Sequence, residues 1–192
     1  MTTIETPLTT LHQGDARDVL LTLADESVQT VVTSPPYWGL RDYGVDGQIG
    51  LEPTPELYVE NMVSIFRDVR RVLRSDGTLW LNMGDSYAGS GAGGGGNRKG
   101  NEHGQHNAVA KKSRPSALPT HKPKDLVGIP WRLAFALQAD GWYLRCDIIW
   151  SKPNPMPESV TDRPTKAHEY IFLLTKSARY YYDAEAIREP QR

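Results

Sequence analysis

The stretch VQTVVTSPPY, residues 28–37, runs from a set of β-branched residues directly into two consecutive prolines. Residues 28–33 are rich enough in valine and threonine to predict a strand buried on both faces, as in a parallel sheet. Pro35 and Pro36 have no backbone N–H, and Pro36 restricts Pro35 to an extended conformation, so the strand must end at Ser34. We therefore predict an α/β sheet with a rigid turn at its carboxyl edge, where open α/β sheets bind ligands.

The segments on both sides of this turn alternate between strand and helix patterns. A hydroxyl at Thr54 followed by Pro55 is a typical helix start, and an apolar face then continues to Leu73. The elements expected before residue 84 are a strand at 10–13, a helix at 16–23, a strand at 28–33, a helix at 55–73, a turn at 75–77 and a strand at 78–83. This alternation predicts an α/β layered fold with right-handed crossovers and a mostly parallel sheet.

The C-terminal third continues the pattern. Because Pro130 stands early in an apolar helical segment, the next helix can begin at Asp125 or only at Ile129, with its apolar side chains at Leu126, Leu133, Phe135, Ala136 and Leu137. We expect that helix to end near Gly141, strands at 143–150 and 168–175, and a tight connection at 176–178 into residues 179–183, RYYYD. The last two segments predict an antiparallel hairpin at one edge of the sheet.

Composition describes an ordinary soluble globular chain. The 192 residues are 39% hydrophobic and 23% charged, with a formal net charge of −1. Cys146 is the single cysteine, which excludes an internal disulfide and a cysteine-based metal cluster and fits a reducing compartment. We expect a cytoplasmic protein without a membrane span and without a metal.

Residues 89–124 interrupt the α/β pattern, because they contain eight glycines and seven basic residues and little to bury. We expect a mobile loop, within which Lys111, Lys112 and Arg114 contact a DNA backbone. The alternative is a solvated insertion that has no binding role.

The turn after the strand has the chemistry to hold a planar group that bears an amine. The carbonyls of Ser34 and Pro35 and the Ser34 hydroxyl can accept N–H hydrogen bonds, while Tyr37 can stack on the ring. The alternative is a proline-rich turn that only ends a strand. A ligand for WW domains is disfavoured, because that motif needs one residue between the second proline and the tyrosine.

Residues 33–37, TSPPY, resemble the catalytic motif (Asp/Asn/Ser)-Pro-Pro-(Tyr/Phe/Trp) of the amino-group DNA methyltransferases. The surrounding blocks resemble the circularly permuted group of that family, in which the catalytic half precedes the cofactor half. These blocks are HQGDARDVLLTLADESVQTVVTSPPYWGLRDYG at 12–44, VRRVLRSDGTLWLNMGDSYAG at 69–89 and WYLRCDIIWSKPNPMPESVTDRPTKAHEYIFLLTKSARYYYD at 142–183. The resemblance implies an S-adenosylmethionine-dependent methyltransferase (Rossmann-like) fold.

The resemblance also implies a reaction and its catalytic residues. A methyl group would pass from S-adenosylmethionine to the exocyclic amine of a base flipped out of double-stranded DNA, with Ser34, Pro35, Pro36 and Tyr37 as the catalytic turn. Serine at the first motif position favours cytosine N4 over adenine N6, because aspartate is commoner in the adenine enzymes. A non-catalytic DNA-binding module is the alternative from another functional class.

Further site residues follow from position around the turn. By resemblance, Asp15 with Ala16 would bind the adenine amino group of the cofactor, whereas the residues alone equally fit a helix-capping aspartate. Trp38 and Arg41 would fill the gap left by the flipped base or contact phosphates, although Trp38 can equally cover the cleft wall. Lys152 and Asn154, in WSKPNPMPES, would line the target-base pocket; the alternative is a proline-stiffened loop.

One expected block is missing from the sequence. The permuted enzymes carry an Asp-Pro-Phe-x-Gly-x-Gly cofactor block after their recognition region, and no such block occurs in residues 1–192. We therefore expect residues 1–192 to be the catalytic half of an incomplete domain. A fragment of a longer enzyme is favoured over a chain that pairs with a second polypeptide and over a decayed remnant.

Overall fold

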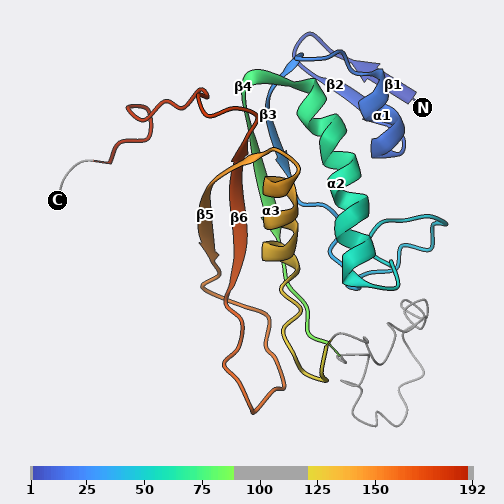
Figure 1. The fold of residues 1–192 in the computed structure, drawn as a ribbon, viewed down its shortest axis with the longest axis vertical. Coiled ribbons are helices and arrows are strands. Elements are labelled where there is room, and N and C mark those ends of the chain that lie inside the picture. Colours follow the sequence, from blue (N-terminus) through green and yellow to red (C-terminus); the bar gives the residue numbers. More distant parts are fainter. Residues whose placement is uncertain (1, 89–120, 190–192) are drawn as a thin grey trace.

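The computed structural model describes residues 2–88 and 121–189 as a small α/β layer structure (Figure 1). Its elements in chain order are β1 (Thr2–Glu5), β2 (Thr10–Gln13), α1 (Ala16–Thr22), β3 (Val28–Thr33), α2 (Pro55–Val72), β4 (Leu73–Met83), α3 (Ile129–Ala139), β5 (Tyr143–Ser151) and β6 (His168–Thr175). All of these elements except β1 were predicted from the sequence, although β4 was expected only from residue 78. Of the two possible starts for α3, Ile129 is the observed one.

The main sheet has the strand order β3-β4-β6-β5. Thr33 pairs with Leu81 in a parallel ladder, whereas β4 with β6 and β5 with β6 are antiparallel. Among the described residues, β3, β4 and β5 run in one direction and β6 runs against them, so the sheet is mixed, with the predicted antiparallel pair, β5 and β6, at one edge. Hydrophobic periodicity reports which faces are buried but not the direction of the neighbouring strand.

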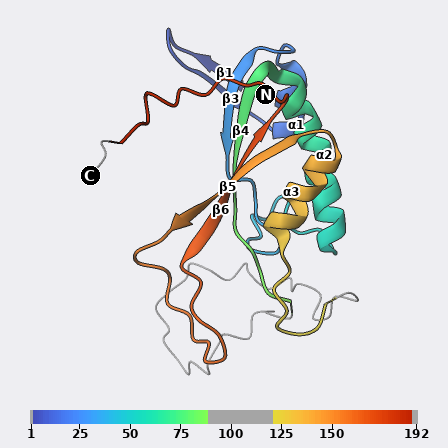
Figure 2. The same cartoon turned by 60° about the vertical axis from the view of Figure 1, so that its left-hand side comes forward.

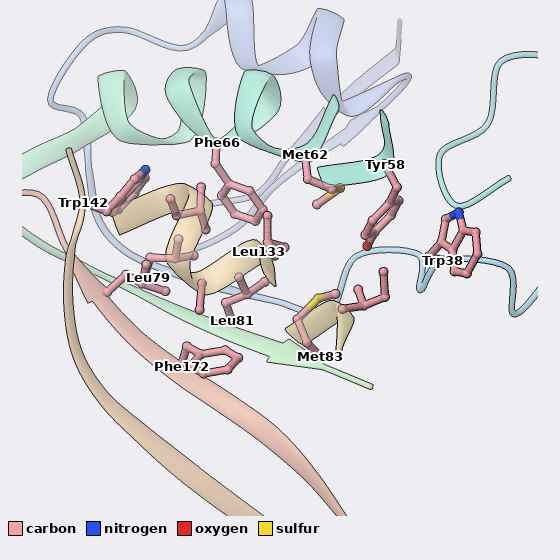
Figure 3. Packing of buried hydrophobic residues seen from close by; sticks show 14 of the residues in the cluster. Trp38, Tyr58, Met62, Phe66, Leu79, Leu81, Met83, Leu133, Trp142 and Phe172 are labelled. Carbon is pink, nitrogen blue, oxygen red and sulfur yellow. The ribbon is translucent and has the colours of Figure 1, made fainter. Parts of the chain in front are cut away.

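The helices α2 and α3 lie on the same side of this sheet (Figures 1 and 2). The Thr54 hydroxyl accepts a hydrogen bond from the Leu57 backbone N–H, which caps the start of α2 as its sequence predicts. The core between the layers joins Tyr58, Met62 and Phe66 of α2 to buried residues of the sheet and of α3 (Figure 3). The partners shown there include Leu79, Leu81, Met83, Leu133 and Phe172.

The start of α3 depends on a side chain from another segment. Gly128, the capping residue, adopts the left-handed conformation with φ 77° and has no side chain to cap the helix. Asp85 Oδ1 accepts from the Gly128 and Ile129 backbone N–H groups, at 3.0 Å each. Asp85 therefore links the end of β4 to the start of α3. The expected apolar face was partly wrong, because Phe135 is 55% exposed and Leu126, which precedes α3, is 51% exposed.

Three other predictions about the elements are corrected. β3 is not buried on both faces, because it is an edge strand in the described sheet and Val32 is 78% exposed. β4 begins at Leu73, so residues 75–77 lie within the strand next to an irregular register and not in a separate turn. Residues 179–183 form no strand, and the antiparallel partner of β6 at this edge is β5.

Among the described residues, no helix is long and apolar enough to span a bilayer. In the same residues, no group of three or more histidine, cysteine, aspartate or glutamate side chains is placed to hold a metal ion.

Candidate active site

The Ser-Pro-Pro-Tyr turn lies at the carboxyl edge of the two parallel strands. β3 ends at Thr33, opposite Leu81, and β4 ends two residues later, so Ser34 and Gly84 follow strand ends at the same edge. Ser34 is exposed there, as expected for a residue that receives a ligand. In the described part of the chain, the Pro35 carbonyl has no hydrogen-bond partner. The position predicted for the turn is therefore confirmed.

A contact with the buried face of α2 holds the turn in place. The Tyr58 hydroxyl, on the buried face of α2, donates to the Pro36 carbonyl at 2.9 Å. Burial raises the pKa of Tyr58, with the Glu52 carboxylate adding to that effect, so the phenol stays protonated and remains a donor. The turn is thus attached to α2 through a hydrogen bond that has little access to water.

The Tyr37 ring is fixed at two ends. A Cβ on Gly84 would stand 2.5 Å from Cε2 of Tyr37, so the ring edge packs where only a glycine leaves room. Its hydroxyl lies 2.8 Å from Asn82 Oδ1 and 3.1 Å from Glu169 Oε2, and can donate to either. Because the side chain is half-buried and restrained at both ends, it offers a stable surface to a ligand.

A polar network joins the turn to β4, β5 and β6. Ser34 Oγ lies within hydrogen-bond distance of Tyr37 Oη, at 3.1 Å, and of Asn82 Oδ1, at 3.2 Å. Asn82 Nδ2 donates to the Tyr170 carbonyl at 3.2 Å, which turns the amide oxygen toward the two hydroxyls. The second carboxylate oxygen of Glu169 forms an ion pair with Lys152. The network thus brings Ser34, Tyr37 and Lys152 together.

The pKa values of two groups in the network differ from those of free side chains. Burial by itself raises the pKa of Glu169, but hydrogen bonds from Lys152, Tyr37 and Asn82 outweigh it and hold this pKa below its usual range. Burial and the nearby Glu169 carboxylate raise the pKa of Tyr37. At neutral pH, the network therefore contains an ionised glutamate beside a protonated phenol.

Asp15 lies at the start of α1 and acts there as a helix cap. Its Oδ1 accepts from the Arg17 backbone N–H at 2.9 Å, and the Arg17 guanidinium binds both carboxylate oxygens. These hydrogen bonds lower the pKa of Asp15 to about 2. The side chain is still 41% exposed, and neighbouring Ala16 is exposed as the first residue of the helix. The capping alternative is confirmed, and the cofactor role of both residues stays a prediction.

Trp38 is not available to DNA. The indole is 3% exposed within the core, and its Nε1–H donates to the Glu52 carbonyl at 2.9 Å (Figure 3). A buried Trp38 cannot contact DNA in this conformation, so the prediction of a DNA contact is contradicted, and the residue belongs to the hydrophobic core. The chain turns sharply after Tyr37, and this sends the next side chain inward.

The remaining predicted DNA contacts have different positions. Arg41 and Asn154 are exposed, on the loop after the turn and on the loop after β5. Lys152 points instead to Glu169 and lies over the Trp150 ring, 5.2 Å from its centroid. Lys111, Lys112 and Arg114 lie outside the described residues.

Sequence reasoning missed four residues of this site, which are Tyr58, Asn82, Gly84 and Glu169. Tyr58 follows the helical period and is indistinguishable from other core positions in sequence. Asn82 was detectable as a polar residue within an apolar strand. Glu169 lies 132 residues from Tyr37 along the chain, and only the pairing of β4 with β6 brings the two together.

Comparison with known proteins identifies the family of the chain. The family model described as DNA methylase, N6_N4_Mtase, matches residues 28–192. The type II methyltransferase M.Cfr9I of Citrobacter freundii is 57% identical over 180 residues, which cover 94% of this chain and 58% of that protein. M.SmaI of Serratia marcescens is 58% identical, with 92% of this chain and 59% of that protein covered. The chain thus spans somewhat more than half the length of these relatives.

Solved structures share the fold. The PvuII DNA methyltransferase, named cytosine-N4-specific, matches with a TM-score of 0.59 at 16% identity, over 92% of this chain and 53% of that one. A putative DNA modification methylase of Thermus thermophilus, in complex with S-adenosyl-L-methionine, matches with a TM-score of 0.57 at 22% identity, over 90% and 55%. The predicted α/β methyltransferase fold is confirmed. With the family model matched across the turn and the whole network around it, the chain belongs to the N6/N4 family of DNA methylases.

Proposed function

We propose that residues 1–192 are the catalytic half of a DNA methyltransferase that moves a methyl group to the N4 amine of a flipped cytosine in double-stranded DNA. The observation that carries this proposal is the exposed Ser34 hydroxyl beside a Pro35 carbonyl without a partner in the described chain, at the end of a parallel strand. Two acceptors in adjacent residues match the two hydrogens of an exocyclic amine.

Positioning by these acceptors would solve the main chemical difficulty of the reaction. The exocyclic amine is a weak nucleophile, because its lone pair is delocalised into the aromatic ring. Hydrogen bonds from its two N–H groups to Ser34 and Pro35 favour a tetrahedral nitrogen and aim the lone pair away from the ring. When bound, S-adenosylmethionine supplies a methyl carbon made electrophilic by a positively charged sulfur. Orientation of the amine in line with that carbon supplies most of the rate enhancement.

Tyr37 would hold the base after it leaves the duplex. An amine within a base pair cannot reach this turn, so the base must be flipped out and stacked on an aromatic surface. The half-buried Tyr37 ring, packed against Gly84 and hydrogen-bonded through its hydroxyl, is restrained before the base arrives. A surface that is already rigid loses little conformational entropy when it binds.

The residues at the start of α1 fit only part of the cofactor. A carboxylate offers about four lone-pair sites, and Arg17 uses three of those on Asp15, so one exposed site is left for an amino group. Asp15 with Ala16 would therefore hold the nucleoside end. The remaining length seen in the relatives is proposed to supply the other contacts, within the same polypeptide or from a second chain.

The choice of cytosine over adenine rests on the resemblance to the family motif, in which serine as the first residue, here Ser34, favours cytosine N4. The bacterial relatives support action in the cytoplasm of a prokaryote. The decisive experiment treats unmethylated DNA with the full natural polypeptide that contains residues 1–192 and labelled S-adenosylmethionine. Nucleosides from the digested DNA are then identified by mass spectrometry. N4-methylcytosine is expected; N6-methyladenine alone would overturn the choice of base.

A DNA-binding module without catalysis is the competing function. Calorimetric titration of the same polypeptide with S-adenosylmethionine separates the two. Saturable binding supports the methyltransferase, whereas DNA binding without cofactor binding and without any methylated nucleoside supports the module.

A further inference from the structure

The hydrogen bonds around the turn form a directed chain from Ser34 to a carboxylate. Ser34 Oγ can donate to Tyr37 Oη at 3.1 Å, and Tyr37 Oη can donate to Glu169 Oε2 at 3.1 Å. Each hydroxyl in this chain can donate its hydrogen to the next oxygen atom in the direction of Glu169. Proton movement along it therefore needs only small shifts of hydrogen atoms between oxygens that are already in contact.

The proposed reaction produces a proton that has to leave the amine. Methyl transfer forms one N–C bond and breaks the sulfonium C–S bond, whose electron pair goes to sulfur. The nitrogen is then left with a positive charge and one proton in excess. In many proteins an acidic side chain accepts such a proton directly, but the first residue of this turn is Ser34, whose hydroxyl cannot keep it.

We propose that Glu169 is the terminal acceptor of this proton, which reaches it through Ser34 and Tyr37. The amine gives its proton to Ser34 Oγ, the Ser34 proton moves to Tyr37 Oη, and the Tyr37 proton moves to Glu169 Oε2. The serine and the tyrosine are neutral before and after, and the carboxylate is neutralised. This inference rests on the proposed methyl transfer and assigns a role to a residue that does not touch the substrate.

Other groups of the network are less suited to be the acceptor. Asn82 Oδ1 is an alternative acceptor for either hydroxyl, but it belongs to a neutral amide, which does not take up a proton at neutral pH. Within the described residues, the titratable groups that face Glu169 are Tyr37 from the turn, Lys152 from the segment after β5 and Lys166 from the segment before β6. Lys152 already donates to the other oxygen of Glu169, so the carboxylate is the acceptor at the end of this chain of hydrogen bonds.

The pKa shifts of Tyr37 and Glu169 favour concerted transfer of the protons along this chain. Because burial and Glu169 raise the pKa of Tyr37, a free phenolate is disfavoured, and the phenol must pass on one proton as it receives another. The hydrogen bonds that lower the pKa of Glu169 keep it ionised and ready before each turnover. The ion pair with Lys152 favours the ionised form of Glu169, so the carboxyl group would then release the proton to solvent.

The test is the pH dependence of single-turnover methyl transfer by the full natural polypeptide, between about pH 6.5 and about pH 9. The wild-type rate should be flat in this range, because Glu169 is ionised throughout. In Glu169→Gln, the proton can leave only to solvent base, so the rate should fall about 100-fold at pH 7. It should then rise as the pH increases. An unchanged rate, or a loss by the same factor at each pH, would overturn the relay.

Three further variants distinguish a proton relay from a purely structural role of Glu169. Tyr37→Phe breaks the same chain and leaves the Glu169–Lys152 ion pair intact, so its rate should also rise with pH. The double variant should be no slower than the slower single variant, and losses that multiply would contradict a shared path. Glu26→Gln is the matched control, because Glu26 is ion-paired to Lys176 and lies outside the chain of hydrogen bonds, and its profile should stay flat.

The outcomes also separate this inference from the function on which it rests. A wild-type polypeptide that produces no methylated nucleoside refutes the proposed function. A wild-type polypeptide that methylates DNA, together with a Glu169→Gln variant whose profile remains flat, refutes only the relay.

Discussion

Gly84 and Tyr37 approach so closely that a single added carbon would displace the ring. A Cβ on Gly84 would lie 2.5 Å from Cε2 and 2.8 Å from Cδ2 of Tyr37. Gly84 follows β4 and Tyr37 follows β3, so this contact joins the ends of the two parallel strands. The glycine is needed for space at a site where the ring is already hydrogen-bonded at its far end.

Gly84→Ala should therefore reduce methyl transfer far more than it reduces stability. The new methyl group pushes the Tyr37 ring away from Asn82 and Glu169, and a misplacement of about 1 Å can cost about 100-fold in rate. The rate with DNA is compared with the free energy of unfolding in urea. Gly141→Ala is the control. A Cβ at Gly141 would meet no atom within 4 Å, but its φ of 102° is unfavourable for alanine, so this substitution should reduce stability more than methyl transfer. A Gly84→Ala enzyme with normal activity would show that Tyr37 need not keep this position.

Tyr58→Phe should weaken the attachment of the turn to α2. The substitution removes one buried hydrogen bond and leaves the Pro36 carbonyl without its donor, at a cost of about 1–2 kcal/mol in the free energy of unfolding. Chemical denaturation measures the loss. Tyr182→Phe, which removes a hydroxyl from a 49% exposed residue, is the control and should change stability by less than about 0.5 kcal/mol. Equal effects of the two substitutions would contradict the anchoring role of Tyr58.

Asp85→Ala should destabilise the start of α3. Asp85 Oδ1 accepts backbone N–H bonds from Ser86, Gly128 and Ile129, and the capping residue Gly128 has no side chain that could take its place. Loss of such a cap costs about 1–2 kcal/mol. Asp85→Asn keeps an acceptor oxygen and should recover most of the loss when unfolding is followed by circular dichroism. If alanine and asparagine destabilise equally, the charge and not the cap is what matters.

Asp15 should make the free energy of unfolding depend on pH in the acid range. Its pKa is about 2 in the folded chain and lies lower than in the unfolded chain, so its contribution is present above about pH 4 and is lost as the pH falls toward 2. The carboxylate is 41% exposed, so the effect is less than about 1 kcal/mol. Asp15→Asn keeps the capping oxygen without the charge. The stability difference between wild type and this variant should shrink between pH 4 and pH 2; a constant difference would contradict the Asp15–Arg17 pairing.

Local sequence patterns predicted most elements because each has a clear period or stop signal. Thr54 and Pro55 start α2 where the sequence predicts, and Pro35 and Pro36 end β3 at the expected edge. The short β1 carried no such signal, since its four residues are all exposed in a two-stranded ribbon with β2.

Features that depend on partners far along the chain were not predictable. The burial of β3 depends on what covers its second face, and the described residues place both α2 and α3 on one side. The same limit explains Trp38, whose direction is set by contact with Glu52, and Glu169, which reaches the site through strand pairing. The Ser-Pro-Pro-Tyr turn itself was predictable because its rigidity is local.

The most direct test of the central claim is the rate of methyl transfer by Ser34→Ala in the full natural polypeptide. Ser34 is exposed, so its loss should change the free energy of unfolding by less than about 1 kcal/mol. If its hydroxyl accepts the amine hydrogen, the rate should fall by about 10- to 100-fold, the equivalent of one strong hydrogen bond. Ser64→Ala, on the exposed face of α2, should leave the rate unchanged. A Ser34→Ala variant that is folded and as fast as the wild type would contradict the account.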